Sequence, residues 1–220
     1  MAVYAIGDIH GCLTALETLF KNLRFSDNDQ FVFLGDYVDR GSDSKGVIDW
    51  LIENGRRFHF IFLKGNHEIM MLESRKSRQT LISWLGFGGH ETLLSYGIKD
   101  DSEWQSRIPA AHWEFMENCR RYFEIGHHLF VHGGLEPGKP LSQQSDHYLF
   151  WKKFETPAMY AADKRVICGH TSRKNGKVAD FGHTICIDTY AYGGQWLTCL
   201  NVETNEILQA NNKGEIRTQS

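Results

Sequence analysis

The chain has 220 residues, of which 41% are hydrophobic and 23% are charged, and its formal net charge is −3. These values are typical of a globular protein and give no reason to expect nucleic acid as a partner. The chain has no run of about 18 apolar residues that would span a membrane, and its first residues lack the basic and apolar regions of a signal peptide. We therefore expect a cytoplasmic protein without a membrane partner.

Two residue types stand out in the composition. Histidine occurs 11 times, and it is the commonest metal ligand and a frequent acid–base group. The five cysteines are scattered and form no C-x-x-C pair. This pattern predicts buried, reduced thiols rather than a disulfide framework or a zinc ribbon.

The first third of the chain alternates strand and helix signals. Short apolar runs at Val3–Ile6, Gln30–Leu34 and Phe58–Leu63 each end at a glycine, which is typical of buried strands. Between them, apolar residues recur at helical spacing over 13–23 and over Val47–Ile52. The β-α-β-α-β order predicts parallel strands joined by crossover helices.

The rest of the chain changes character twice. Residues 68–121 are helical and loop-rich, with a glycine cluster at 86–89 that we interpret as a turn or a mobile lid. Later strands follow with short connections, which favours a second, more antiparallel sheet; they are expected at Phe123–Ile125, His128–Val131, Arg165–Cys168, Ile185–Asp188, Trp196–Leu200 and Glu206–Gln209. We expect one domain over residues 1–210 and a frayed polar tail over 211–220.

Polar side chains follow each of the first three strands at the point where the strand ends. The segments read GDIHG, GDYVDRG and GNHE. Asp8 and His10 point to the same side of an extended segment, Asp36 offers two carboxylate oxygens that can bridge two ions, and Asn66 offers a carbonyl oxygen. Because ligands bind at the carboxyl ends of parallel strands, these groups predict a site for divalent ions such as Mn, Fe or Zn.

Two later strands also end in histidine beside glycine. His132 begins an HGG segment, and His170 lies in a GHT segment after a buried strand. Both would complete a second ion site. His183 precedes a strand and competes for the same role, but the glycine setting favours His170. Turn preference alone explains the Asp, Asn and Gly residues, but it does not explain the histidines.

The ordered set GDIHG, GDYVDRG, GNHE, HGG and GHT, over residues 3–190, resembles the phosphoprotein phosphatase family of serine/threonine phosphatases. This family belongs to the metallophosphoesterase superfamily, and the resemblance is to its short bacterial and bacteriophage-lambda-phosphatase-like branch. It implies an α/β fold in which a sandwich of two packed mixed β-sheets is flanked by helices (α/β/β/α). It also implies two divalent ions, of which Mn is favoured.

The resemblance also assigns roles to residues. His67 would be the general acid, Asp39 would orient His67, and Arg40 and Asn66 would bind phosphate. The first ion would be held by Asp8, His10 and Asp36, and the second by Asp36, Asn66, His132 and His170. Two ions held in this way would lower the pKa of a bound water, so the resemblance implies direct attack of hydroxide on phosphorus.

The predicted function is therefore metal-dependent phosphomonoester hydrolysis with phosphoprotein or phosphopeptide substrates. A dinucleoside polyphosphate hydrolase of the diadenosine tetraphosphate type, or another small phosphoester hydrolase, is the first alternative. Such relatives typically lack the residue equivalent to Asp39 and end the third motif in Asp. An inactive phosphoprotein-binding module is the second alternative, and the presence of every expected ligand argues against it.

Two positions depart from the family pattern. Lys153 stands where relatives carry an Arg after a Trp, so we expect it to bind phosphate without the two-pronged contact of a guanidinium. Alternatively, Lys152 and Lys153 are both solvated. Tyr190 stands where relatives usually have Gly, at the floor or rim of the site.

Overall fold

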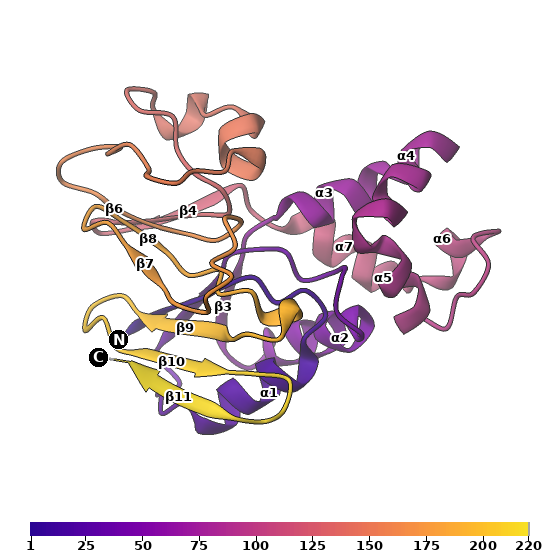
Figure 1. The fold of residues 1–220 in the computed structure, drawn as a ribbon, viewed down its shortest axis with the longest axis horizontal. Helices are drawn as coiled ribbons and strands as arrows, with labels where there is room; N and C mark the ends of the chain where they lie inside the picture. The colour runs from indigo at the N-terminus through magenta and orange to yellow at the C-terminus, as the bar shows by residue number, and fades with distance from the viewer. Residues whose placement is uncertain (220) are drawn as a thin grey trace.

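The computed structural model describes residues 1–219, and two β-sheets form its centre (Figure 1). The strand order is β11-β10-β9-β1-β2-β3 in the first sheet and β4-β5-β6-β8-β7 in the second. The strands are β1 Val3–Ile6, β2 Gln30–Phe33, β3 His59–Phe62, β4 Tyr122–Ile125, β5 His128–Val131, β6 Arg165–Cys168, β7 Ala179–Asp180, β8 Thr184–Cys186, β9 Leu197–Asn201, β10 Ile207–Ala210 and β11 Ile216–Gln219.

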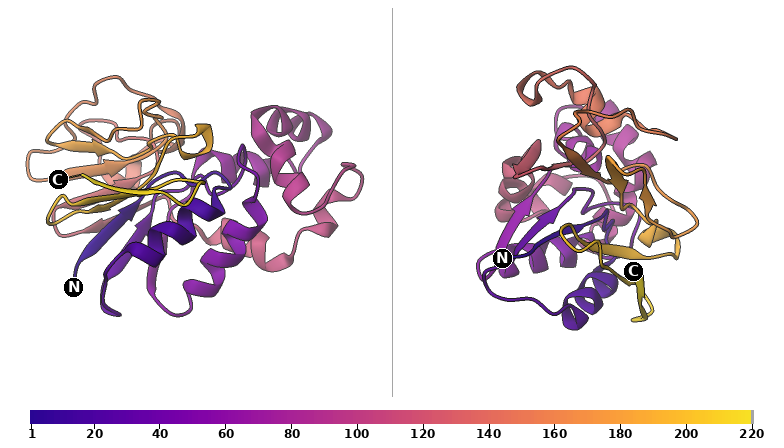
Figure 2. Two further views of the ribbon diagram at one scale, coloured as in Figure 1. Left: turned by 60° about the horizontal axis from the view of Figure 1, so that its bottom comes forward. Right: turned by 90° about the vertical axis from the view of Figure 1, so that its left-hand side faces the viewer.

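The helices lie outside the two sheets (Figures 1 and 2). The α-helices are α1 Leu13–Asn22, α2 Ser44–Asn54, α3 Asn66–Glu73, α4 Arg78–Trp84, α5 His90–Ser95, α6 Trp104–Arg107 and α7 Ala110–Asn118, and the shorter helical turns are η1 Leu85–Gly89, η2 Leu141–Gln143, η3 His147–Trp151 and η4 Ala191–Gly193. In the described part of the chain, no helix is long and apolar enough to cross a membrane.

The first three strands are parallel, as predicted, because α1 and α2 return the chain to the same end of the sheet. Alternate side chains then face opposite ways. Val3 and Ala5 pack between the two sheets, whereas Tyr4 and Ile6 belong to the cluster formed with α1 and α2. β1, at the centre of the first sheet, is therefore buried on both faces.

The later strands do not form one antiparallel sheet, and that expectation is wrong. β9 pairs antiparallel with β1 and extends the first sheet, followed by β10 and β11. In the second sheet, β5, β6 and β8 are parallel, and only β4 and β7 run antiparallel at its edges. The reason is that every residue of β9 is buried, which suits a central position that a half-exposed strand cannot take.

The polar tail is also ordered over its described part, so the expectation of a frayed end is wrong up to residue 219. Ile216–Gln219 pairs with β10, with Ile216 opposite Ala210. The Asn211 side-chain oxygen accepts hydrogen bonds from the backbone N–H groups of Lys213 and Glu215, which closes the connecting turn. Residue 220 lies outside the described residues.

The layers follow from the apolar clusters. One cluster fills the space between the sheets, one packs α1 and α2 on the first sheet, and one packs residues 135–160 on the outer face of the second sheet. Helices α3 to α7 form a lobe beside the sheets with its own apolar cluster (Figure 2). The predicted fold of two mixed sheets flanked by helices is confirmed, and all five cysteines are buried and unpaired, as predicted.

Candidate active site

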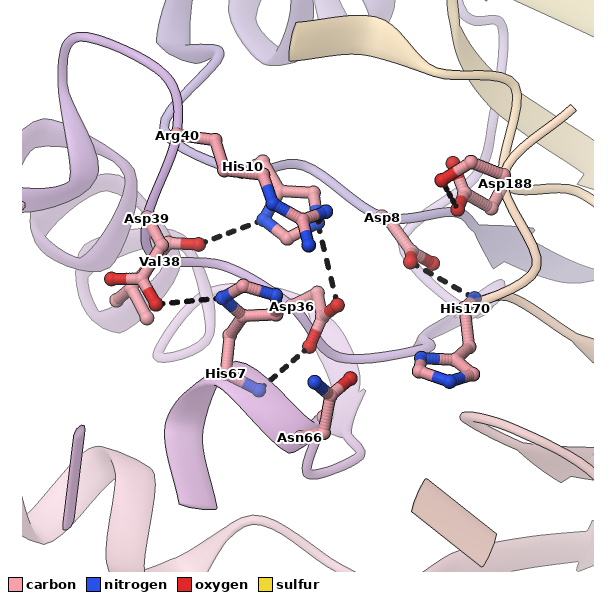
Figure 3. Close-up of polar contacts among 12 residues, drawn as sticks. Asp8, His10, Asp36, Val38, Asp39, Arg40, Asn66, His67, His170 and Asp188 are labelled. Carbon is pink, nitrogen blue, oxygen red and sulfur yellow. Dashed lines mark hydrogen bonds and ion pairs between the residues drawn. The ribbon is translucent and has the colours of Figure 1, made fainter. Parts of the chain in front are cut away.

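Strand ends from both sheets meet at one edge of the sandwich, and Asp36 lies at their centre (Figure 3). Asp36 follows β2 and is 2% exposed. Its Oδ2 atom is 3.3 Å from Nε2 of His10, which follows β1. Its Oδ1 atom is 3.4 Å from Nε2 of His132, which follows β5 in the second sheet. One carboxylate therefore faces histidines delivered by both sheets.

The backbone of the site is strained. Positive φ angles at non-glycine residues cost roughly 1–2 kcal/mol each and collect at functional sites. Within residues 1–219, six of the eight such residues lie at this edge, with φ between 46° and 73°, namely His10, Asp36, Asp39, Arg40, His170 and Tyr190. The surrounding packing holds the loops in these conformations and so fixes the directions of their side chains.

Backbone carbonyl groups orient the three histidines. His10 Nδ1 donates to the Val38 carbonyl and His132 Nδ1 donates to the Leu34 carbonyl, each at 2.9 Å. The Nε2 lone pair of each ring therefore points to Asp36. His170 is turned the other way, because its Nε2 donates to a carbonyl of the η3 turn at 3.1 Å and leaves Nδ1 free for a ligand role.

Two carboxylates are buried in the same cluster. Burial raises the pKa of Asp8 well above its usual range, and the nearby Asp188 and Asp36 add to the effect. Burial also opposes the charge of Asp36, but His132, His67 and His10 outweigh it and hold the pKa of Asp36 well below its usual range.

The donor set fits divalent cations. Asp8 Oδ2 accepts the backbone N–H of His170 at 2.9 Å, while its buried Oδ1 has no hydrogen-bond partner in the described structure. Burial, with His132 beside it, lowers the pKa of His170 to about 3, so its ring is neutral and able to ligate. The Arg40 guanidinium is a positive group that contacts this cluster, with Nη1 3.0 Å from His10 Nε2. Buried lone pairs and an orphaned carboxylate oxygen are what a cation site requires.

The structure brings most of the expected ligands together and separates one competitor. Two groups have potential ligand atoms within 4.8 Å of one another, namely His10, Asp36 and His67, and Asp36, His132 and His170. Asn66 Oδ1 adjoins the second group, 3.0 Å from His132 Nε2. His183 is elsewhere, where its Nδ1 contacts Thr184 Oγ1 at 2.9 Å and its ring lines a different cavity.

His67 and Asp39 form a buried pair. His67 Nδ1 donates to Asp39 Oδ2 at 2.7 Å, and the side chains are 1% and 0% exposed. The His67 backbone N–H donates to Asp36 Oδ1 at 3.1 Å, so the pair is tied to the ion cluster. A histidine held by a carboxylate in this way can act as a proton donor at its other nitrogen. His67 also lies within ligand distance of His10 and Asp36.

Glu68 helps to hold the loops of the site together. Its position in the sequence indicates only an acidic residue in the first turn of a helix, near the positive end of the helix dipole. Its carboxylate is fully buried and accepts four backbone N–H groups, from Gly65, Asp36, Tyr37 and Val38. Burial raises the pKa of Glu68 to about 7, with Asp36 adding and the backbone N–H groups opposing. Glu68 thus joins the β2 loop to the start of α3. Its carboxylate accepts the Gly65 N–H, which is one half of a capping box, but Gly65 has no side chain to form the other half, so the capping-box sequence pattern is absent here.

The cluster opens into a cavity of about 470 Å³. Its lining consists of Asp36, Arg40, Asn66, His67, Met70, Phe87, Trp151, Lys153, His170, Thr171, Ser172, Lys174, Tyr190 and Tyr192. Lys153 therefore reaches the site, whereas Lys152 lines a separate apolar cavity. The Arg40 guanidinium lies over the Tyr192 ring at 4.7 Å.

Tyr190 belongs to the wall of this cavity. It has φ +63°, and its ring packs against Tyr192 with centroids 4.6 Å apart. A Cβ at position 193 would lie 1.8 Å from the Tyr190 ring, so Gly193 is the residue that admits the ring. The large residue at 190 is therefore accommodated by a glycine three positions later.

Known proteins resemble this chain in sequence and in fold. The model of the calcineurin-like phosphoesterase family matches residues 1–198. A serine/threonine-protein phosphatase 1 of Salmonella typhimurium is 35% identical over 91% of this chain and 92% of its own. A symmetrical bis(5'-nucleosyl)-tetraphosphatase of Xylella fastidiosa is 25% identical over 96% of this chain and 90% of its own. The solved structure of a cold-active protein-tyrosine phosphatase of a Shewanella species has a TM-score of 0.68 at 18% identity, covering 99% of this chain and 80% of that one, which shows the shared fold.

Proposed function

The chain belongs to the calcineurin-like phosphoesterase family, and we propose that within it the chain hydrolyses phosphoserine and phosphothreonine in proteins. The observation that carries this proposal is the buried pair of His67 and Asp39, whose atoms are 2.7 Å apart. A serine or threonine alkoxide is a poor leaving group and needs a proton as its bond to phosphorus breaks. General acid catalysis of this kind contributes about 10²–10⁴-fold.

The same pair matters less for a dinucleoside polyphosphate. There the leaving group is a phosphate oxygen, which departs as a stable anion without a proton. A chain that retains Asp39 as the partner of His67 is therefore better suited to an alkoxide. The 35% identity to a serine/threonine-protein phosphatase points the same way.

Each site residue then has a chemical task. Two divalent ions, for which we propose Mn²⁺, would supply Lewis-acid activation of water and of the phosphoryl group, and they would be held by Asp8, His10, Asp36, Asn66, His132 and His170. His67 would protonate the leaving oxygen from its Nε2 side, because Nδ1 is bound to Asp39. Arg40 and Lys153 would bind the phosphoryl oxygens, with Arg40 able to offer two parallel N–H groups.

The second candidate is hydrolysis of a dinucleoside polyphosphate. It is favoured by three cationic side chains around one cavity, Arg40, Lys153 and Lys174, which would suit a chain of several phosphates. It is also the activity named for the Xylella relative. The third, an inactive phosphoprotein-binding module, requires that no substrate be turned over.

One comparison of initial rates tests all three. We expect the Mn²⁺-loaded protein to hydrolyse a phosphoserine peptide faster than diadenosine tetraphosphate, and a chelator to abolish both rates. A faster rate on diadenosine tetraphosphate would contradict the proposal, and no turnover with Mn²⁺, Fe²⁺ or Zn²⁺ would favour the binding module. His67→Asn should lower kcat on the peptide while both ions stay bound; loss of an ion would make His67 a ligand instead.

A further inference from the structure

The carboxylate of Asp39 is held by two further side chains besides His67. Trp84 Nε1 donates to Oδ2 at 2.9 Å and to Oδ1 at 3.1 Å. Thr92 Oγ1 donates to Oδ1 at 2.7 Å. The Asp39 side chain is 0% exposed, so water cannot replace these donors. The orientation of its carboxylate therefore depends on hydrogen bonds from the α4–η1–α5 segment.

Thr92 also holds the backbone of Asp39. The Asp39 N–H lies 2.8 Å from Thr92 Oγ1 and 3.0 Å from Ser44 Oγ, and it donates to both. One hydroxyl thus accepts from the main chain of Asp39 and donates to its side chain. This matters because Asp39 has φ +73°, a conformation that an aspartate keeps only when its surroundings hold it.

The glycine cluster at 86–89 explains how the segment comes so close. The Arg40 N–H donates to the Gly88 carbonyl at 3.1 Å, and a Cβ on Gly88 would lie 2.8 Å from the same nitrogen. A Cβ on Gly89 would lie 2.5 Å from the Trp84 ring. The cluster is therefore the contact point between the helical lobe and the loop that carries Asp39, rather than a free turn.

Trp84 is a donor of fixed direction. Its side chain is 1% exposed and its ring packs against Trp104 with centroids 5.2 Å apart. Its indole N–H can be satisfied only by Asp39 in this environment, and it cannot follow the carboxylate if the carboxylate turns. A carboxylate with both oxygens fixed in this way presents its remaining lone pair to His67 Nδ1 and so fixes the imidazole plane.

We propose that Trp84 and Thr92 are positioning residues for proton donation by His67, acting through Asp39. The inference rests on the proposed role of His67 as general acid. It predicts a loss that grows as the leaving group becomes poorer, because only a poor leaving group needs an aligned proton donor. A purely structural role predicts an equal loss on all substrates.

The test uses two aryl phosphates, p-nitrophenyl phosphate and phenyl phosphate, whose leaving groups are good and poor. For Trp84→Phe in the Mn²⁺-loaded full chain, we expect kcat on phenyl phosphate to fall about 10–100-fold, the range found for residues that orient ligating or catalytic groups. We expect a smaller fall on p-nitrophenyl phosphate. Trp113→Phe is the matched control, because Trp113 belongs to the same apolar cluster but its Nε1 donates to the Gln105 carbonyl rather than to Asp39, and the rates of this variant should change less than about twofold.

A second pair of variants guards against misfolding of Trp84→Phe. Thr92→Val should reproduce the selective loss on phenyl phosphate, and Thr92→Ser, which keeps the hydroxyl, should restore it. Equal losses on both substrates, or no loss, would overturn the proposal. The proposed protein phosphatase activity fails separately, if the wild type hydrolyses both aryl phosphates but no phosphoserine peptide.

Discussion

An alanine at position 88 should disrupt the contact between the helical lobe and the active-site loop. Gly88 has φ +110°, where an L side chain is strained, and this strain costs about 1–3 kcal/mol. Its new Cβ would lie 2.8 Å from both the backbone nitrogen and Cγ of Arg40, and overpacking of this kind costs typically about 1–3 kcal/mol. The sum predicts a loss of about 2–6 kcal/mol in the free energy of unfolding. Because Arg40 is displaced, KM for a phosphomonoester should rise as well.

Gly86 provides the matched control in the same cluster. A Cβ there meets nothing within 4 Å, and its φ is not positive. Gly86→Ala should therefore leave KM unchanged and raise stability by up to about 1 kcal/mol, since Ala favours helix over Gly. Equilibrium urea unfolding and steady-state kinetics on p-nitrophenyl phosphate measure both quantities. Equal effects of the two substitutions would refute the packing argument.

Three further predictions concern the ion cluster and the cavity. His170→Ala should lower the stoichiometry or affinity of bound Mn²⁺ measured by calorimetry, and His183→Ala should not; the opposite result would exchange their assignments. Lys153→Arg should lower KM for a phosphomonoester, because a guanidinium binds two phosphoryl oxygens, and an unchanged or higher KM would exclude a phosphate contact. Apparent Mn²⁺ affinity should rise as the pH is raised above the ordinary titration range of an aspartate, because burial raises the pKa of Asp8 and the ion must displace the proton that the metal-free protein retains there; affinity independent of pH would contradict this.

Local sequence patterns were sufficient to predict the fold of the first third of the chain. Apolar runs at strand length, separated by apolar residues at helical spacing, specify β1, β2 and β3 as parallel neighbours. Local patterns did not predict how the later strands pair. β9 lies beside β1, about two hundred residues earlier in the chain, and the order of strands in a sheet depends on which faces are buried rather than on any local period. For the same reason the polar sequence of β11 gave no sign that it would close the edge of the first sheet.

The residues of the site likewise fall into those that the sequence predicts and those that only the tertiary structure identifies. Asp8, His10, Asp36, Asn66, His132 and His170 could be named as candidate ligands from the sequence, because each follows a strand beside a glycine and parallel strands end at one edge. The sequence also singled out the pair of His67 and Asp39 through the resemblance. Only the tertiary structure decided that His170 rather than His183 joins the cluster, and that Trp84 and Thr92 hold Asp39. Such contacts join side chains tens of residues apart in the chain, so neither motif spacing nor periodicity predicts them. They form only because the helical lobe packs on the loops that follow the strands.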